Sequence, residues 1–155
     1  MNKTLSVSAI QNGTVIDHIP AGQALRIIHL LRLLKEKYRV TVGFNLSSQR
    51  MQLKDLIKIE NHTLTNKQAN EITVFAPDAT INIIKNFEVT EKIITRLPES
   101  ISGVFSCPNP ACVTHGEPVE TFFMIEEQGK HVQVQCKYCE KTFDRNHVKQ
   151  TKVKI

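Results

Sequence analysis

Apolar and polar residues alternate along two short stretches in the first half of the chain. This alternation is found at residues 4–9 and 40–46; residues 55–60, which are rich in β-branched residues, and residues 80–84 are also expected to form strands. A period of two places every second side chain on the same face, so each alternating stretch predicts a β-strand. We expect residues 14–16, after the turn signal at 11–13, and residues 87–89 to be extended and to belong to the same sheet.

Two further stretches follow the helical period of 3.6 residues. After Pro20, which suits the first turn of a helix, apolar residues recur as far as Leu34. Thr65 and Gln68 then form a capping-box pattern before a second apolar stripe, which we expect Pro77 to end. The predicted order is therefore β-α-β-β-α-β, the ferredoxin-like arrangement, with both helices on one face of an antiparallel sheet. The edge strands of such a sheet can pair with a second copy.

The composition changes after a linker-like segment at residues 97–100. Strands are expected at residues 119–125 and 132–134, joined through Gln128 and Gly129. A segment of this size has little room for a core, and a metal is the usual solution. We therefore predict an α+β protein with a ferredoxin-like N-terminal domain at residues 1–97 and a small all-β, zinc-ribbon-like domain at 102–155.

All four cysteines of the chain lie in this second segment, in two short clusters. They are Cys107, Cys112, Cys136 and Cys139. Two such pairs supply the tetrahedral thiolate set of a structural Zn²⁺, and four protein ligands leave no position open for substrate. Two disulfides are the alternative, which an intracellular protein disfavours. With the tetrahedron full, His115 and His131 are expected at the surface.

The net charge of +5 and the pI near 9.1 allow several functions. A nucleic-acid partner is one, but the basic residues are scattered and aromatic residues are few. An anionic small molecule or an acidic protein fits equally well. No signal peptide and no membrane-spanning run are found, so we expect a cytoplasmic protein without a membrane partner.

No pattern typical of catalysis is present in the sequence. The chain has no nucleophile elbow, Walker A loop or Gly-rich dinucleotide turn. Any bound phosphate would need lysine side chains, and Lys54, Lys58, Lys85 and Lys92 lie on or beside the expected strands. From the residues alone, the chain is a non-enzymatic, zinc-stapled protein that binds an anion or another protein.

Four motifs carry a resemblance to a known family. They are GTVIDHIP at residues 13–20, KDLIKIEN at 54–61, AP and ATIN within 76–82, and the two cysteine clusters ending in CKYCE at 136–140. In this order and spacing the chain resembles the regulatory chain of aspartate carbamoyltransferase. The resemblance implies a chain without catalytic activity, whose zinc domain docks on catalytic chains. It also implies dimers formed through the N-terminal domain, with three dimers joining two catalytic trimers.

The resemblance further implies a site for the nucleotide effectors CTP, UTP and ATP. CTP, often with UTP, would inhibit and ATP would activate, and Mg²⁺ could bridge phosphates when two nucleotides bind. Asp17 would bind the ribose, Lys58 would reach the ribose and base region, and His18, Lys54 and Lys92 would lie near the phosphates. The other implied positions line the pocket or contact the base: Val7, Ala9, Ile10, Val15, Asn82 and Val89.

Two positions depart from enterobacterial members of that family. Ser8 stands where they carry an acidic residue, and Phe87 stands where they carry tyrosine. Both positions would border the pocket, so we expect them to affect the preference among nucleotides. The alternative that the sequence leaves open is a zinc-ribbon protein that binds nucleic acid, for which salt-dependent DNA or RNA binding would be the sign.

Overall fold

A computed structural model describes residues 9–129 and 131–151 of the chain. They divide into two compact units, one that runs as far as Arg96 and one that begins at Leu97. Within the described residues, neither helix has the length and apolar character needed to cross a membrane.

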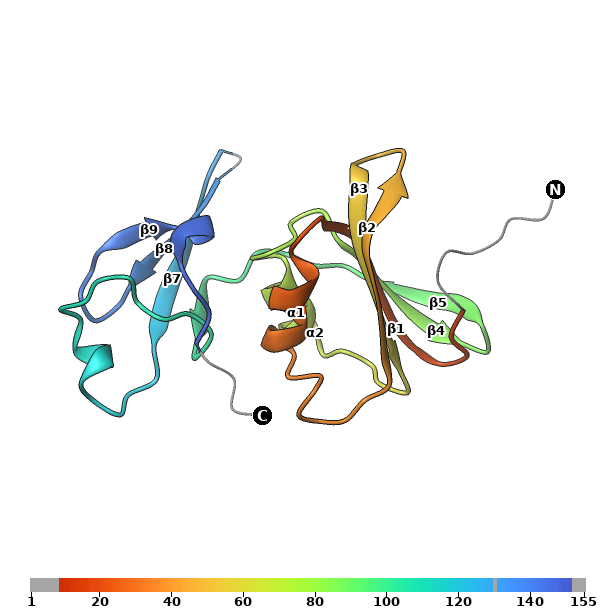
Figure 1. Cartoon of the computed structure of the whole chain (residues 1–155), viewed down its shortest axis with the longest axis horizontal. Helices are drawn as coiled ribbons and strands as arrows, with labels where there is room; N and C mark the ends of the chain where they lie inside the picture. Colours follow the sequence, from red (N-terminus) through yellow and green to blue (C-terminus); the bar gives the residue numbers. More distant parts are fainter. Residues whose placement is uncertain (1–8, 130, 152–155) are drawn as a thin grey trace. The chain divides into compact units, whose positions relative to one another are not determined.

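The N-terminal unit is a five-stranded sheet with two helices. Its elements are β1 (Gly13–Pro20), α1 (Ala24–Leu30), β2 (Val40–Ser48), β3 (Gln52–Glu60), α2 (Asn66–Ile72), β4 (Thr80–Lys85) and β5 (Glu88–Ile93). The strands are antiparallel in the order β2-β3-β1-β4-β5. The first six elements follow the predicted β-α-β-β-α-β order, and β5 adds a strand beside β4. Both helices lie on one side of the sheet (Figure 1).

The core of this unit lies between the helices and that face of the sheet. Ile16, Ile57 and Ile81, from three neighbouring strands, are almost fully buried, as are Ile27 of α1 and Ile72 of α2. The opposite residues of each strand point to the other face because side chains alternate along a strand. The helix-covered face thus holds the apolar core and leaves the other face for polar residues.

The predicted capping box starts α2, and both of its hydrogen bonds are present. The Gln68 N–H donates to the Thr65 hydroxyl oxygen at 3.1 Å, and the Thr65 N–H donates to the Gln68 side-chain oxygen at 3.0 Å. The predicted end of this helix at Pro77 is wrong. The helix ends at Ile72, and Val74 and Phe75 instead bury their side chains from the turn that follows.

The helix predicted as far as Leu34 is also shorter than its apolar stripe. It ends at Leu30, and Arg32 adopts a positive φ of 54°. This turn reverses the exposure that helical periodicity predicts: Leu33 is fully buried, whereas Leu34 is 61% exposed. Of the strand predicted at residues 4–9, all but Ala9 lies outside the described residues, and Ala9 is in no regular element.

The C-terminal unit is built around a second antiparallel sheet. Its strands β6 (Ser100–Ser102), β7 (Phe122–Gln128), β8 (His131–Cys136) and β9 (Thr142–Asp144) follow one another in that order. Two 3₁₀ turns, at Val113–His115 and Arg145–His147, complete it. The core is small, and its centre is an edge-to-face pair of Phe105 and Phe123 with ring centroids 5.8 Å apart. The prediction of an α+β protein is confirmed.

Candidate functional site

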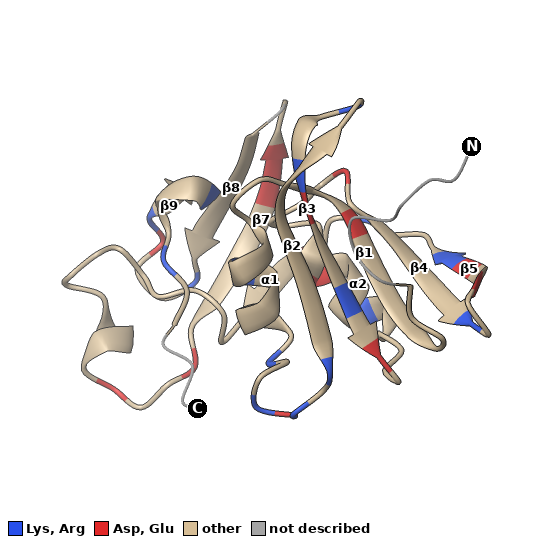
Figure 2. Cartoon of the chain, turned by 45° about the vertical axis from the view of Figure 1, so that its right-hand side comes forward, with Lys and Arg blue, Asp and Glu red and all other residues tan. Residues whose placement is uncertain are grey.

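Four of the predicted effector residues form one row across the sheet of the N-terminal unit. Lys58 of β3 pairs with Val15 of β1, Val15 pairs with Asn82 of β4, and Asn82 pairs with Lys92 of β5. Residues directly opposite each other in antiparallel strands project from the same face. The row therefore lies on the face away from the helices. In Figure 2 basic positions on β3 and β5 are blue, and an acidic position on β1 is red.

Asp17 and His18 lie farther along β1, at an irregularity of the sheet. The pairing of β1 with β3 shifts between Ile16 and Ile19, and His18 has a φ of 57°. The Asp17 carboxylate accepts a hydrogen bond of 2.6 Å from the His18 N–H and forms an ion pair of 2.9 Å with Lys54 Nζ. The His18 ring Nδ1 lies 3.1 Å from the Thr80 hydroxyl oxygen.

These contacts determine the charge of Asp17. Burial raises the pKa of this carboxyl, but the hydrogen bond and charge of Lys54 and the His18 N–H outweigh burial and lower it overall. Asp17 is therefore a carboxylate near neutral pH, able to accept hydrogen bonds.

Lys58 and Asn82 both place polar groups in poorly solvated surroundings. Lys58 is only 8% exposed, and burial lowers the pKa of its ammonium group, while the charge of Asp17 acts in the opposite direction. The side-chain oxygen of Asn82 is buried and has no hydrogen-bond partner among the described residues. A buried acceptor without a donor costs about 1–3 kcal/mol. A ligand that supplied a donor would satisfy the Asn82 oxygen, and one that brought negative charge to Lys58 would favour its charged form.

The remaining predicted effector residues do not belong to the row across the sheet. Val7, like the divergent Ser8, lies outside the described residues. Ala9 and Ile10 precede β1, and the neighbouring Gln11 carbonyl accepts a hydrogen bond of 2.9 Å from the Phe87 N–H. This contact places the chain before β1 beside the turn between β4 and β5.

Beyond that turn, Val89 belongs to β5 and is 54% exposed, while Phe87 has a φ of 67° and is 63% exposed. Thr80, the partner of His18, was missed from sequence. Only its place opposite Asp17 in the pairing of β1 with β4 reveals it.

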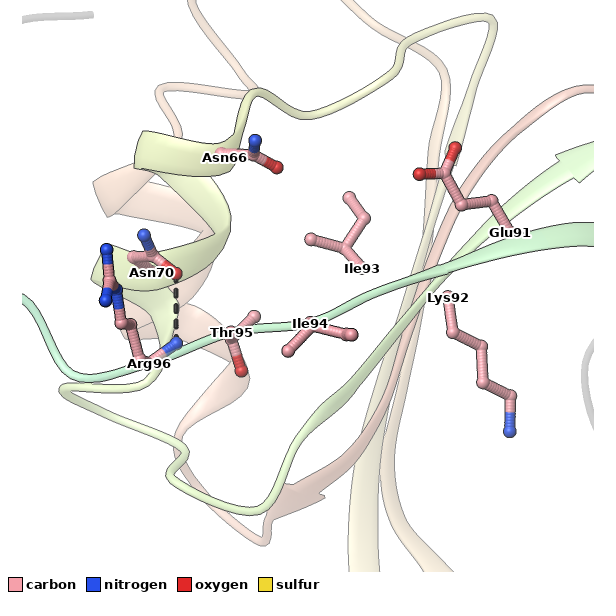
Figure 3. Close-up of a pocket in the computed structure, with 8 residues that line it drawn as sticks. All are labelled: Asn66, Asn70, Glu91, Lys92, Ile93, Ile94, Thr95 and Arg96. Atoms are coloured by element: carbon pink, nitrogen blue, oxygen red, sulfur yellow. Dashed lines mark hydrogen bonds between the residues drawn. The ribbon is translucent and has the colours of Figure 1, made fainter.

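A separate hollow of about 540 Å³ lies beside α2 in the same unit. It is lined by Asn66, Asn70, Glu91, Lys92, Ile93, Ile94, Thr95 and Arg96. Lys92 is its only residue in common with the predicted effector set, and its side chain points away from α2 (Figure 3). The Arg96 N–H donates to the Asn70 side-chain oxygen at 3.0 Å and closes one side of the hollow. This hollow is therefore distinct from the row across the open face.

The second candidate site is the cysteine cluster of the C-terminal unit. The four sulfur atoms lie within 4.8 Å of one another, and none is in a disulfide. The Cys107–Cys139 and Cys112–Cys136 sulfur pairs are 3.6 and 3.8 Å apart. Zn–S bonds of about 2.3 Å place the sulfurs of a tetrahedral site about 3.8 Å apart, so the cluster fits such an ion. The disulfide alternative is wrong.

Hydrogen bonds around this cluster favour thiolates at two of the cysteines. Burial raises the pKa of Cys139, but the Lys141 backbone, the Asn109 side chain and neighbouring thiols outweigh it and lower the pKa to about 7. Burial likewise raises the pKa of Cys112, but hydrogen bonds outweigh burial and lower this pKa overall. The largest of these contributions comes from the Thr114 hydroxyl, which donates to the Cys112 sulfur at 3.2 Å.

Burial raises the pKa of the other two thiols, Cys107 and Cys136. A metal ion needs all four thiols deprotonated, so the contacts at Cys112 and Cys139 favour metal binding, and the burial of the other two acts against it.

Both histidines near the cysteines lie outside the ligand set. Nε2 of the exposed His115 lies 2.8 Å from the Cys107 carbonyl oxygen, and His131 is exposed at the start of β8. His115 therefore contacts the backbone of the first cluster rather than contributing a ligand. Thr114 is the residue that sequence reasoning missed here. A hydroxyl two positions after a cysteine was the available signal.

Comparison with known proteins covers nearly the whole chain. Residues 5–96 match the family model of the aspartate carbamoyltransferase regulatory chain, allosteric domain, and residues 99–149 match that of its metal binding domain. The chain is 50% identical over 148 residues to the aspartate carbamoyltransferase regulatory chain of Chromobacterium violaceum, covering 96% of this chain and 97% of that one. It is 51% identical over 144 residues to the protein of the same name from Aeromonas hydrophila, with coverages of 93% and 94%. The chain belongs to the family of aspartate carbamoyltransferase regulatory chains.

Proposed function

We propose that the chain binds nucleotide effectors on the open face of its N-terminal sheet and passes their effect to catalytic chains of aspartate carbamoyltransferase. CTP, together with UTP, inhibits and ATP activates. Residues 1–97 bind the nucleotide and form the dimer, and residues 102–155 dock on the catalytic chain. The assembly contains three regulatory dimers and two catalytic trimers, and it works in the cytoplasm.

The observation that carries this proposal is the row of Lys58, Val15, Asn82 and Lys92. From β3 to β5 the row crosses three strand-to-strand steps of about 4.8 Å, about 14 Å in all. An extended ligand with a polyphosphate at one end and hydrogen-bonding groups at the other suits the spacing, and a nucleoside triphosphate has this form.

The chemistry of the row and of the neighbouring Asp17 and His18 supports the same class of ligand. Near Asp17, a carboxylate that stays ionised can accept hydrogen bonds from the two hydroxyls of a ribose. Lys54, Lys58, Lys92 and His18 supply donors for phosphate oxygens, and Mg²⁺ can bridge phosphates when two nucleotides bind together. A bound anion would favour the charged form of Lys58, whose pKa is lowered by burial in the free protein.

For the C-terminal unit we propose one structural zinc ion per chain, held by the four cysteines. With all four positions filled by protein, the ion supplies no catalytic chemistry and serves to hold the fold. Exposed apolar side chains near the cluster support a docking role for this unit. They are Val113 and Val119 on the segment that follows Cys112, Met124 on β7, and Tyr138 between the last two cysteines.

Regulation then follows from differential binding. A nucleotide changes activity only through its different affinities for the less active and more active forms of the assembly. Coupling energies of this kind are typically about 1–3 kcal/mol, or about 5- to 150-fold in affinity. CTP therefore has a higher affinity for the less active form, and ATP for the more active one.

The test combines assembly with activity. The zinc-loaded chain is mixed with the catalytic trimer of the same organism, the product is sized by gel filtration, and the aspartate saturation curve is measured with CTP, UTP and ATP. A large complex whose curve shifts with nucleotide supports the proposal. A complex that ignores all three nucleotides refutes the effector role, and the absence of any complex with zinc present refutes the docking role. Salt-sensitive binding of DNA by the unassembled chain would instead favour the nucleic-acid alternative.

A further inference from the structure

Asp55 is a fully buried carboxylate that the proposed effector site does not use. It lies in β3, on the helix-covered face that it shares with Ile57, and it has no exposed surface. Its neighbour Lys54 projects to the opposite face, where it pairs with Asp17. A charged group buried this completely is rare unless its oxygens are satisfied.

Three backbone N–H groups satisfy this carboxylate. Gly22 and Ala24 donate to one oxygen at 2.8 and 3.2 Å, and Asn45 donates to the other at 3.0 Å. The first two belong to the turn into α1, whose N-cap residue Gln23 makes no side-chain capping bond. The helix also has no acidic residue in its first turn. Asp55 therefore caps α1 from a distant part of the sequence, where a negative charge is favourable.

The same carboxylate lies between two irregularities of the sheet. On one side, the pairing of β1 with β3 shifts between Ile16 and Ile19, at the bulge that carries Asp17 and His18. On the other side, the pairing of β2 with β3 shifts between Gly43 and Leu46. Asn45, within that second shift, has a φ of 54°. Bulges redirect side chains and recur next to functional sites, so their geometry has to be held in place.

We propose that Asp55 is a positioning residue of the effector site. It fixes the turn after β1 and thereby the bulge that directs Asp17 and His18 to the open face, and it ties that bulge to the one in the edge strand β2. The inference rests on the proposed function of that face, since it concerns how the face is held. Asp55 itself never touches the nucleotide.

The variant Asp55→Asn tests this with almost no change of shape. An asparagine keeps one acceptor oxygen but places an NH₂ group where at least one backbone N–H now donates, so two donors face each other. The exposed Glu36 of the same unit supplies the control, because Glu36→Gln removes the same charge from the surface. Both variants are made in the full-length, zinc-loaded chain and measured where circular dichroism shows them folded.

Two readouts separate positioning from stability. Calorimetric titration with CTP should give a Kd roughly tenfold higher for Asp55→Asn than for wild type, the change that follows from about one weakened charge-assisted hydrogen bond. NMR of histidine-labelled chains should show shifted ring resonances for His18 and unchanged ones for the exposed His29. Glu36→Gln should match wild type in both. A folded Asp55→Asn chain with wild-type CTP affinity and wild-type His18 resonances overturns the proposal.

The outcomes also distinguish this inference from the proposed function. If wild type itself fails to bind CTP, the proposed function is wrong, and the His18 resonances of Asp55→Asn alone decide the role of Asp55. If Asp55→Asn does not fold, CTP is titrated into the wild-type chain labelled uniformly with ¹⁵N. Shifts of the Gly22 and Asn45 amide resonances then support the link through Asp55, and unmoved resonances overturn it.

Discussion

Replacing Lys58 with methionine should separate nucleotide binding from stability. Methionine is nearly as long as the lysine stem and leaves no large cavity. Lys58 is only 8% exposed and its charged form is disfavoured by burial. The substitution removes the cost of burying the Lys58 charge and also the attraction between Lys58 and Asp17. Asp17 keeps its ion pair with Lys54. We therefore expect the free energy of unfolding to stay the same or to rise by about 1 kcal/mol.

Nucleotide binding should change in the opposite direction. A hydrogen bond to a charged group contributes about 1.5–3 kcal/mol, which corresponds to roughly a 10- to 150-fold increase in the Kd for CTP. The assay is calorimetric titration of CTP, with urea denaturation of the same samples. Lys85→Met is the matched control, since Lys85 is exposed at the end of β4 and carries the same charge. We expect the control to change neither quantity appreciably.

Two results would refute the reasoning. If Lys58→Met binds CTP as tightly as wild type, Lys58 is not part of the effector site. If both variants weaken CTP binding equally, the effect belongs to the overall charge of the chain, and the row across the sheet carries no specific recognition. Aspartate saturation curves of assemblies made with Lys58→Met should likewise lose their response to CTP while the assembly itself stays intact.

Three further predictions concern the metal and the fold. Cys112→Ser should lose zinc, measured by a colorimetric chelator, and should no longer assemble with the catalytic trimer, because metal binding and folding of this unit are linked; normal assembly would contradict this. Gly13→Ala should lower the free energy of unfolding by about 2 kcal/mol or more, since its Cβ would collide with the Ile59 carbonyl at a φ of 142°; an unchanged urea midpoint would argue against the collision. Asp17→Asn should be less stable than wild type above the ordinary carboxyl pKa of 3.8, and the difference should vanish as the pH falls through the lower folded pKa of Asp17; a difference that persists in strong acid would exclude the ion pair as its source.

The fold was predictable wherever local signals agreed with the tertiary structure. The capping box at Thr65 predicts the start of α2, and runs of β-branched residues predict β3 and β4. The ends of both helices were not predictable, because residues such as Leu33 reach the core from a turn with positive φ at Arg32. Helical periodicity cannot distinguish such a turn from one more turn of helix.

The two sites differ in how much the sequence reveals. The cysteine spacing was sufficient to predict the metal cluster, and the family suggested by the motifs is confirmed, as is its regulatory rather than catalytic character. The effector residues stay a prediction. Their arrangement depends on the pairing of β1 with both β3 and β4, which brings Lys58 and Asn82 to either side of Val15. No local pattern in the sequence specifies how these strands pair.

The ion pair between Asp17 and Lys54 has a consequence for selectivity. In the free protein each of these groups already has a partner at 2.9 Å. A phosphate that draws Lys54 away leaves the Asp17 carboxylate without its cation, and an uncompensated charge in a half-buried place is costly. A ligand that brings sugar hydroxyls along with its phosphates gives Asp17 new partners in the same event. If the open face binds nucleotides as proposed, the pair would make the site discriminate against inorganic phosphate and pyrophosphate and favour ligands that satisfy both residues at once.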